Sequence, residues 1–185
     1  LEKIPVIFGE KDVIKALQLM PGVNTAGEGS SGFYVRGGSA DQNLIWIDEA
    51  PVYNASHLLG FFSVFNTDAL KDVNLYKSAM SPKYGGRLSS VLDVTMNNGN
   101  LKKWNFSGGL GLISSRLTVE GPLKKDKGSI IISGRRSYAD LFLRGSSNPT
   151  LRETQTYFYD INAKVNYKIG KKDRIFASMY YGKDV

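Results

Sequence analysis

The sequence predicts an α+β domain with a short four-stranded sheet, followed by antiparallel β-strands that belong to an incomplete transmembrane β-barrel. Three observations support this fold class. Residues 1–99 carry 8 basic and 10 acidic side chains (net −2), whereas residues 100–185 carry 16 and 7 (net +9). The first part alternates short apolar segments with glycine and proline turns. The second part contains long segments in which apolar and polar residues alternate.

The first part is predicted to contain one helix and four short strands. Residues 11–20 place apolar side chains at helical spacing, and Pro21 and Gly22 end the helix. The aromatic segment 57–65 is expected to pack in the core, with a short helix as one option. Strands are expected at FYVRGG (33–38), at 44–48, at 72–77 and at 89–96.

The second part is predicted to consist of about five long strands, near residues 104–111, 115–121, 129–136, 157–169 and 174–182. In 157–169, Tyr157, Ile161 and Val165 share one face, while Asp160 and Lys164 share the other. Thirteen alternating residues exceed the usual strand of about five or six. Tight basic turns and one long connection are typical of a membrane barrel with apolar residues outside. An antiparallel sheet with one face on a soluble core fits this pattern equally well.

The composition excludes several kinds of site. The chain has no cysteine, so disulfide scaffolds, thiol nucleophiles and cysteine-ligated metals are excluded. With His57 as its single histidine, a histidine metal centre or a Ser-His-Asp triad is not expected. The acidic residues of the first part are scattered over turns and strand ends. We therefore expect no catalytic residues, no metal site and no cofactor.

The order of segments in the first part resembles the plug domain of TonB-dependent outer-membrane transporters, most closely their Bacteroidetes-type members. Residues 104–136 resemble the first barrel strands of that family. The resemblance implies a plug domain at 1–99, the first barrel strands at 100–185, and an outer-membrane location. It also implies that this chain is a fragment of a much longer protein. The matching segments are ALQLMPGV (16–23), GFYVRGG (32–38), DQNLIWIDEAPVYN (41–54) and ALKDVNLYKSAMSPKYGGRLSSVLDVTMNNG (69–99).

The resemblance implies a receptor that imports a scarce solute when TonB displaces the plug, with no enzymatic activity. The solute, whether siderophore, cobalamin, glycan or peptide, is left open, as is a signalling role in place of transport. The implied partners are TonB, through a segment before residue 1, an extracellular solute and outer-membrane lipid. The alternative is a soluble β-rich binding module, with nucleic acid as one ligand. Because the tyrosines of 157–167 fall opposite Lys164 and Lys168, we expect no nucleic-acid binding.

Two sets of residues are predicted to act in such a receptor. Loops 24–31 and 53–58 are rich in Ser, Asn, Gly, Tyr and His, which suits adaptable hydrogen bonding to a solute. In the resembled family the apical plug loops contact substrate, which here implies Glu28, Ser30, Ser31, Tyr53, Asn54 and His57. Arginine binds carboxylates with a planar fork. We therefore expect the plug to be seated on the barrel wall through Arg36, Arg87 and Glu120.

An unclosed set of barrel strands is also expected to associate with itself. Its two edges and its apolar face have no partner within the fragment, and unpaired edges accept further strands. The 185-residue fragment is therefore predicted to self-associate outside a membrane.

Overall fold

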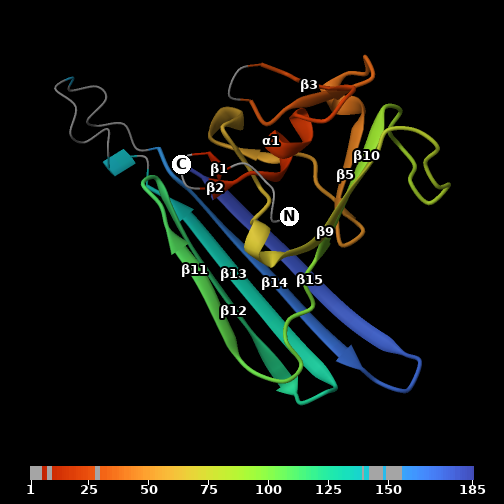
Figure 1. Ribbon diagram of the computed structural model, residues 1–185, viewed down its shortest axis with the longest axis vertical. Coiled ribbons are helices and arrows are strands. Elements are labelled where there is room, and N and C mark those ends of the chain that lie inside the picture. The colour runs from red at the N-terminus through yellow and green to blue at the C-terminus, as the bar shows by residue number, and fades with distance from the viewer. Residues whose placement is uncertain (1–5, 8–9, 28–29, 139, 142–147, 149–155) are drawn as a thin grey trace. The chain divides into compact units, whose positions relative to one another are not determined.

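The computed structural model describes residues 6–7, 10–27, 30–138, 140–141, 148 and 156–185. The chain forms two compact units (Figure 1). The first unit comprises mainly residues 11–96, and the second comprises residues 97–185 together with 6–10. Each unit is described separately below.

The first unit is built on a four-stranded sheet with the strand order β6-β5-β10-β9. Strand β10 is central: it runs parallel to β5 and antiparallel to β9, while β6 pairs with β5. The strands are β5 (Asn43–Ile47), β6 (Ala50–Pro51), β9 (Leu70–Tyr76) and β10 (Ser90–Met96).

Helix α1 (Val13–Gln18) and a small hairpin accompany this sheet. The hairpin pairs β3 (Val23–Thr25) with β4 (Phe33–Val35). Asp12 caps the helix, because its Oδ1 accepts a hydrogen bond from the Lys15 amide at 3.1 Å. Its Oδ2 accepts a second bond from the Ser63 amide at 2.8 Å, which ties the helix start to a distant segment.

The core of the first unit is formed by apolar side chains from α1, the hairpin and the sheet. Asn43 and Ser90 form a matched set of buried polar groups inside this core. The Asn43 amide donates to the Phe33 carbonyl at 2.7 Å, and its oxygen accepts from the Ser90 hydroxyl at 2.7 Å. Buried members of this core include Val13, Ile14, Leu17, Phe33, Val35, Leu44, Ile47, Phe65, Val91, Leu92 and Val94.

Short elements complete this part of the chain. They are β7 (Ser56–His57) with β8 (Phe62–Ser63), and the 3₁₀ turns η1 (Ala40–Gln42), η2 (Leu58–Gly60) and η3 (Thr67–Ala69). Strand β1 (Val6–Ile7) pairs with β2 (Glu10–Lys11), and residues 6–10 are grouped with the second unit.

The predicted helix and strands of the first unit are present, with two corrections. Phe33–Val35 lies in the hairpin and not in the main sheet, whose fourth strand is the two-residue β6. The short helix considered for 57–65 is present only as the three-residue 3₁₀ turn η2, which lies between β7 and β8. Its expected packing is confirmed, since Phe62, Val64 and Phe65 are buried.

The second unit is a single antiparallel sheet in which the five long strands follow one another in sequence order. All five predicted strands are present within a few residues of their expected ends. They are β11 (Asn105–Leu110), β12 (Ser114–Lys124), β13 (Gly128–Ser137), β14 (Phe158–Lys168) and β15 (Arg174–Asp184).

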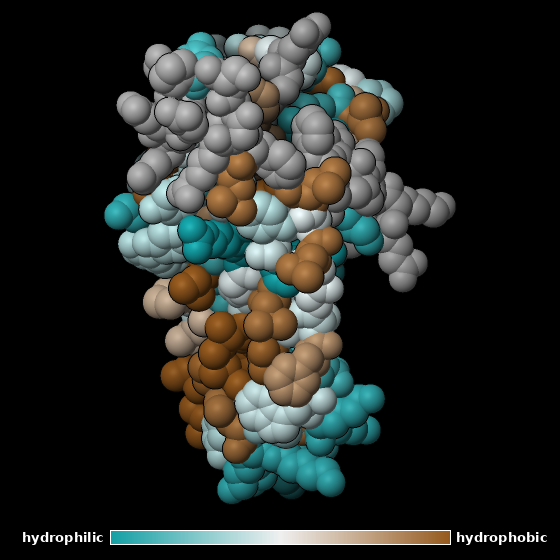
Figure 2. Space-filling model, turned by 90° about the vertical axis from the view of Figure 1, so that its left-hand side faces the viewer, coloured by the Kyte–Doolittle hydropathy of each residue, from teal (hydrophilic) through white to brown (hydrophobic). Residues whose placement is uncertain are grey.

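The two faces of this sheet differ as the alternation predicts. On β14, Asp160, Asn162 and Lys164 are buried, while Ile161 and Val165 are exposed. The apolar face is therefore the outward one, which is the arrangement of a membrane barrel wall. Figure 2 shows hydrophobic residues gathered over the strand region and hydrophilic residues at its lower end. Within the described residues, none of the helices is both long enough and apolar enough to cross a bilayer.

Candidate functional site

The first unit contains two adjoining clefts that share four lining residues. The larger has a volume of about 540 Å³ and the smaller about 270 Å³. The shared residues are Ala40, Asp41, Ile45 and Tyr53. The larger cleft also reaches Trp46 and Arg87, and the smaller one reaches Ser31 and Asn54. These two clefts are called the plug clefts below.

The wall of the smaller cleft is held by helix α1. The Gln18 side-chain amide donates to the carbonyls of Ser30 and Gly32, each at 2.8 Å. The Ser31 amide donates to the Gly60 carbonyl at 2.5 Å. Ser31 is only 4% exposed, and its Oγ has no partner among the described residues. A buried hydroxyl without a partner is costly, so a ligand oxygen in this cleft would gain a ready hydrogen bond.

A tight turn positions Tyr53 at the junction of the clefts. Asp48 and Glu49 connect β5 to β6 with φ of 47° and 70°, and two consecutive positive φ angles are typical of a hairpin turn of type I′. Asp48 Oδ1 accepts from the Met96 amide at 3.1 Å, which fixes this turn to β10. Tyr53 follows with its side chain 88% exposed. Its ring is therefore free to stack on a ligand.

An aromatic cluster packs on the main sheet of the first unit. Tyr84 packs against Trp46 and Tyr76, with ring centroids 5.1 and 5.5 Å apart. Its hydroxyl donates to Asp93 Oδ2 at 2.5 Å. Burial, followed by the bond to the Asp93 carboxylate, raises the pKa of the Tyr84 hydroxyl above its ordinary value. Tyr84 therefore stays neutral at physiological pH and holds the loop that carries Arg87.

The predicted substrate-facing residues are only partly brought together. Tyr53, Asn54 and Ser31 line the plug clefts. Ser30 lies beside them and accepts from the Gly32 amide at 3.0 Å through its Oγ. His57 is 3% exposed, so the expectation that the loop presents it to solvent is wrong. The same correction applies to the side chain of Ser31, and Glu28 lies outside the described residues.

The three residues expected to hold the plug against the barrel wall, Arg36, Arg87 and Glu120, lie in different environments. Arg36 is exposed and has a φ of 50°, at the end of β4. Gly37 follows with a φ of 82°, and a Cβ on Gly38 would lie 2.4 Å from Ser89 Oγ, so the paired glycines are required for this turn. Arg87 is exposed and borders the larger cleft. Glu120 accepts from the Asn105 amide at 3.0 Å within the five-stranded sheet.

The polar face of the sheet holds an ion pair that the sequence prediction missed. Arg135 and Asp160 are direct cross-strand partners on β13 and β14, and both are buried. Arg135 donates from Nε and Nη2 to Asp160 Oδ2 at 2.9 and 2.6 Å. Both residues fell on predicted polar faces. The register that joins them is a tertiary property, and no local signal in the sequence specifies it.

Other residues of this face are also engaged. The hydroxyls of Thr118 and Ser133 share a hydrogen bond at 2.6 Å, and Lys164 lies 4.8 Å from the centroid of the Phe176 ring. In the described ranges, no group of three or more His, Cys, Asp or Glu side chains is placed to hold a metal ion. In the first unit, the plug clefts are lined by hydrogen-bonding, aromatic and cationic side chains.

Comparison with known proteins agrees with this architecture. Residues 6–91 match the family model of the TonB-dependent receptor plug domain. The siderophore receptor PirA from Acinetobacter baumannii superposes with a TM-score of 0.67 at 19% identity, covering 100% of this chain. The ferric enterobactin receptor PfeA, crystallised with BCV-L6, gives a TM-score of 0.62 at 16% identity over 94% of this chain.

A mutant of PfeA from Pseudomonas aeruginosa, in complex with enterobactin, gives a TM-score of 0.59 at 16% identity over 94% of this chain. This chain spans about 30% of the length of each of these receptors. No curated protein matches the sequence significantly. Residues 6–91 are thus similar to the plug domain of TonB-dependent receptors, and the chain as a whole shares its fold with part of these siderophore receptors.

Proposed function

We propose that the whole receptor binds a ferric siderophore at the plug clefts and imports it when TonB displaces the plug. The observation that carries this proposal is the plug-domain match over residues 6–91, in a chain whose fold is shared with siderophore receptors. The receptor acts by binding and displacement, with no catalytic step. The earlier options of cobalamin, glycan and peptide become outcomes of the test.

The chemistry of the plug clefts supports a ferric chelate. Three catecholates carry a charge of about −6, so their complex with Fe³⁺ keeps a net charge of about −3. Arg87 offers an exposed guanidinium at the larger cleft, and Tyr53 offers an aromatic face at the junction. Ser31 offers a buried hydroxyl in the smaller cleft. These groups can recognise the charge, rings and oxygens of such a ligand.

Displacement of the plug needs a barrel wall that holds it reversibly. The inward face of β12–β14 presents hydroxyl, amide and charged side chains, including Thr118, Ser133, Asn162 and Lys164. Polar surfaces that exchange contacts with water separate at less cost than dry apolar surfaces. This face therefore suits a wall past which a plug and a solute must move.

Replacing Tyr53 with alanine is expected to weaken binding of ferric enterobactin about tenfold, because an exposed aromatic at the centre of a site is a typical energetic anchor. Tyr34→Ala is the matched control, since Tyr34 is also partly exposed but lines neither plug cleft. The measurement is binding of ⁵⁵Fe-labelled ligand to cells that express the full-length receptor. Equal losses for both variants would argue against the plug clefts.

Removal of TonB separates binding from transport. Cells without TonB should still bind the ferric siderophore at the surface but should not accumulate iron. If cobalamin or a glycan binds and no ferric siderophore does, the substrate class is wrong while the receptor assignment stands. If uptake continues without TonB, the proposed transport mechanism is wrong.

We retain the proposal that Arg36 and Arg87 pair with carboxylates of the barrel wall such as Glu120, because both arginines are exposed. Arg36→Ala is expected to loosen the plug and to increase entry of a large antibiotic by a few fold. Lys71→Ala, which removes an exposed charge from β9, is the control. Antibiotic sensitivity of cells with the full-length receptor measures the effect, and sensitivity equal to wild type contradicts it.

Strand β14 by itself gives the nucleic-acid alternative no support. Binding of a single strand needs cations and aromatic rings on one surface. On β14, Tyr159 and Tyr167 lie on the face opposite Lys164, which is buried. Self-association of the 185-residue fragment stays a prediction, which light scattering without detergent can test.

A further inference from the structure

The outward face of the five-stranded sheet is organised in rows that run across the strands. Residues that are direct partners in an antiparallel sheet lie on the same face. One row, called the groove row, consists of Gly108, Leu117, Gly134, Ile161 and Tyr181. The neighbouring row, called the boundary row, consists of Leu110, Ser115, Arg136, Tyr159 and Lys183.

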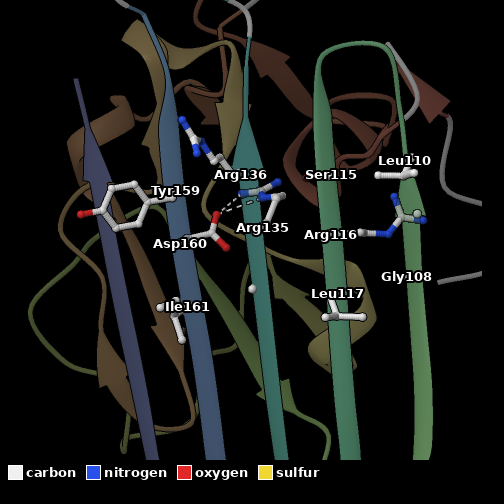
Figure 3. A pocket seen from close by; sticks show the side chains of 12 residues that line it. Gly108, Leu110, Ser115, Arg116, Leu117, Arg135, Arg136, Tyr159, Asp160 and Ile161 are labelled. Atoms are coloured by element: carbon white, nitrogen blue, oxygen red, sulfur yellow. Dashed lines mark hydrogen bonds and ion pairs between the residues drawn. The ribbon is translucent and has the colours of Figure 1, made fainter.

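The groove row contains a depression with a volume of about 750 Å³. Gly134 is one of its lining residues. Leu117 and Ile161 stand on the two strands adjacent to that of Gly134 (Figure 3). A Cβ on Gly134 would meet no atom closer than 3.9 Å, so neither backbone nor side chains require glycine here. The missing side chain leaves an apolar slot between Leu117 and Ile161.

At one end of this slot, the boundary row brings polar and charged side chains next to the apolar ones. Figure 3 shows Arg136, Tyr159 and Ser115 one level above Leu117 and Ile161. Arg136 is exposed, and its guanidinium lies 5.3 Å from the centroid of the Tyr157 ring. Lys183 is exposed on the neighbouring strand, opposite Tyr159. Arg136 and two kinds of hydroxyl therefore border an apolar slot, and Lys183 lies in the same row one strand beyond Tyr159.

On the other side of the slot the face stays apolar. The next row consists of Phe106, Val119, Ile132, Ala163 and Met179. The slot thus connects an apolar region with a cationic border. Such a surface is complementary to a lipid: the acyl chains would contact the apolar region, and the anionic head group would contact the cationic border.

The length of the connections assigns the boundary row to one side of the membrane. Residues 138–157 form the long connection between β13 and β14, at the end where Arg136 and Tyr159 lie. The β12–β13 and β14–β15 connections at the opposite end are short. Long loops of outer-membrane barrels face the extracellular side. If the sheet is part of a receptor barrel, the boundary row lies at the outer leaflet.

We propose that the slot over Gly134 binds an acyl chain of a phosphate-bearing lipid of the outer leaflet, and that Arg136 and Lys183 bind its phosphate. The proposal rests on the proposed function in one respect only, the placement of this face against lipid. Arginine and lysine are suited to phosphate through charge-assisted hydrogen bonds. A tyrosine pair beside the slot, Tyr159 and Tyr181 at 6.1 Å, matches the aromatic girdle at a membrane surface.

Native mass spectrometry of the full-length receptor, titrated with diphosphoryl lipid A in detergent, tests the proposal. Gly134→Leu fills the slot and is expected to reduce retained lipid about tenfold. Ala177→Leu is the matched control, because it places the same leucine side chain on the same outward face away from the slot and should retain lipid as wild type does.

A second variant examines the head group without changing the slot. Arg136→Gln should reduce retention about tenfold and should abolish the preference for diphosphoryl lipid A over its dephosphorylated form. Lys124→Gln, which removes a cation at the opposite end of the strands, is the control. Inorganic phosphate alone should not compete, since it lacks the acyl chain.

The outcomes separate this proposal from the function of the receptor. Retention that is equal in wild type, Gly134→Leu and Arg136→Gln overturns the lipid site, even where ferric siderophore uptake is normal. Retention that depends on Gly134 but is insensitive to lipid phosphate overturns the assignment of the head group. Specific loss in both variants supports the site, including in a receptor that fails to import a siderophore.

Discussion

Asp160→Ala is expected to destabilise the five-stranded sheet by about 3–5 kcal/mol, the largest effect that we expect for a polar residue of this chain. Asp160 accepts two hydrogen bonds from the buried Arg135. Its removal leaves the guanidinium in a poorly hydrated place without this carboxylate. A urea titration of the full-length receptor, followed by the gel mobility of the folded barrel, should show a lower midpoint.

The double variant Arg135→Leu with Asp160→Leu distinguishes an uncompensated charge from lost packing. Replacing both partners of a buried ion pair by apolar residues often costs little. The double variant should therefore be more stable than Asp160→Ala alone. If the double variant is equally destabilised, the cost does not come from the unpaired charge.

The second large effect is expected for Phe65→Ala. Phe65 is 1% exposed in the core of the first unit, and truncation of a buried phenylalanine to alanine costs about 3–5 kcal/mol. We expect faster amide exchange in β5 and β10, by roughly 10²–10³-fold where exchange requires opening of the unit. Hydrogen–deuterium exchange with mass spectrometry on the full-length receptor measures this directly.

Phe61→Ala provides the matched control, because the same substitution is made four residues away at a side chain that is 56% exposed. Exposed substitutions usually change stability by less than about 0.5 kcal/mol. Exchange in β5 and β10 should therefore remain as in wild type. Similar exchange in both variants would mean that Phe65 is not a core residue of this unit.

The long strands could be predicted from the sequence because their signal is local. In β14, alternation places Asp160 and Asn162 opposite Ile161 and Val165, and a segment of this length leaves little freedom in assigning faces. The small elements gave no comparable signal. Strand β6 has two residues, one of them proline, and two residues cannot show a period.

The candidate site was harder to predict because burial of a loop is decided by distant contacts. Loop 53–58 is polar, which favours exposure, yet His57 is buried through the pairing of β7 with β8. Ser31 is likewise placed by the distant Gly60 carbonyl. Asp41 lines both plug clefts, but it was not among the predicted site residues. Its DQN segment was interpreted only as a connection between strands.

The central place of β10 in the main sheet has a consequence for the order in which the first unit can fold. Residues 90–96 pair with both β5 and β9, and the parallel pairing of Asn43 with Ser90 closes a loop of more than forty residues. During synthesis from the N-terminus, β5 and β9 are therefore both complete before β10, the strand that pairs with each of them, has been made. Closing long loops slows folding. The nascent segment should stay unfolded, and so open to chaperones, until its last strand has been synthesised.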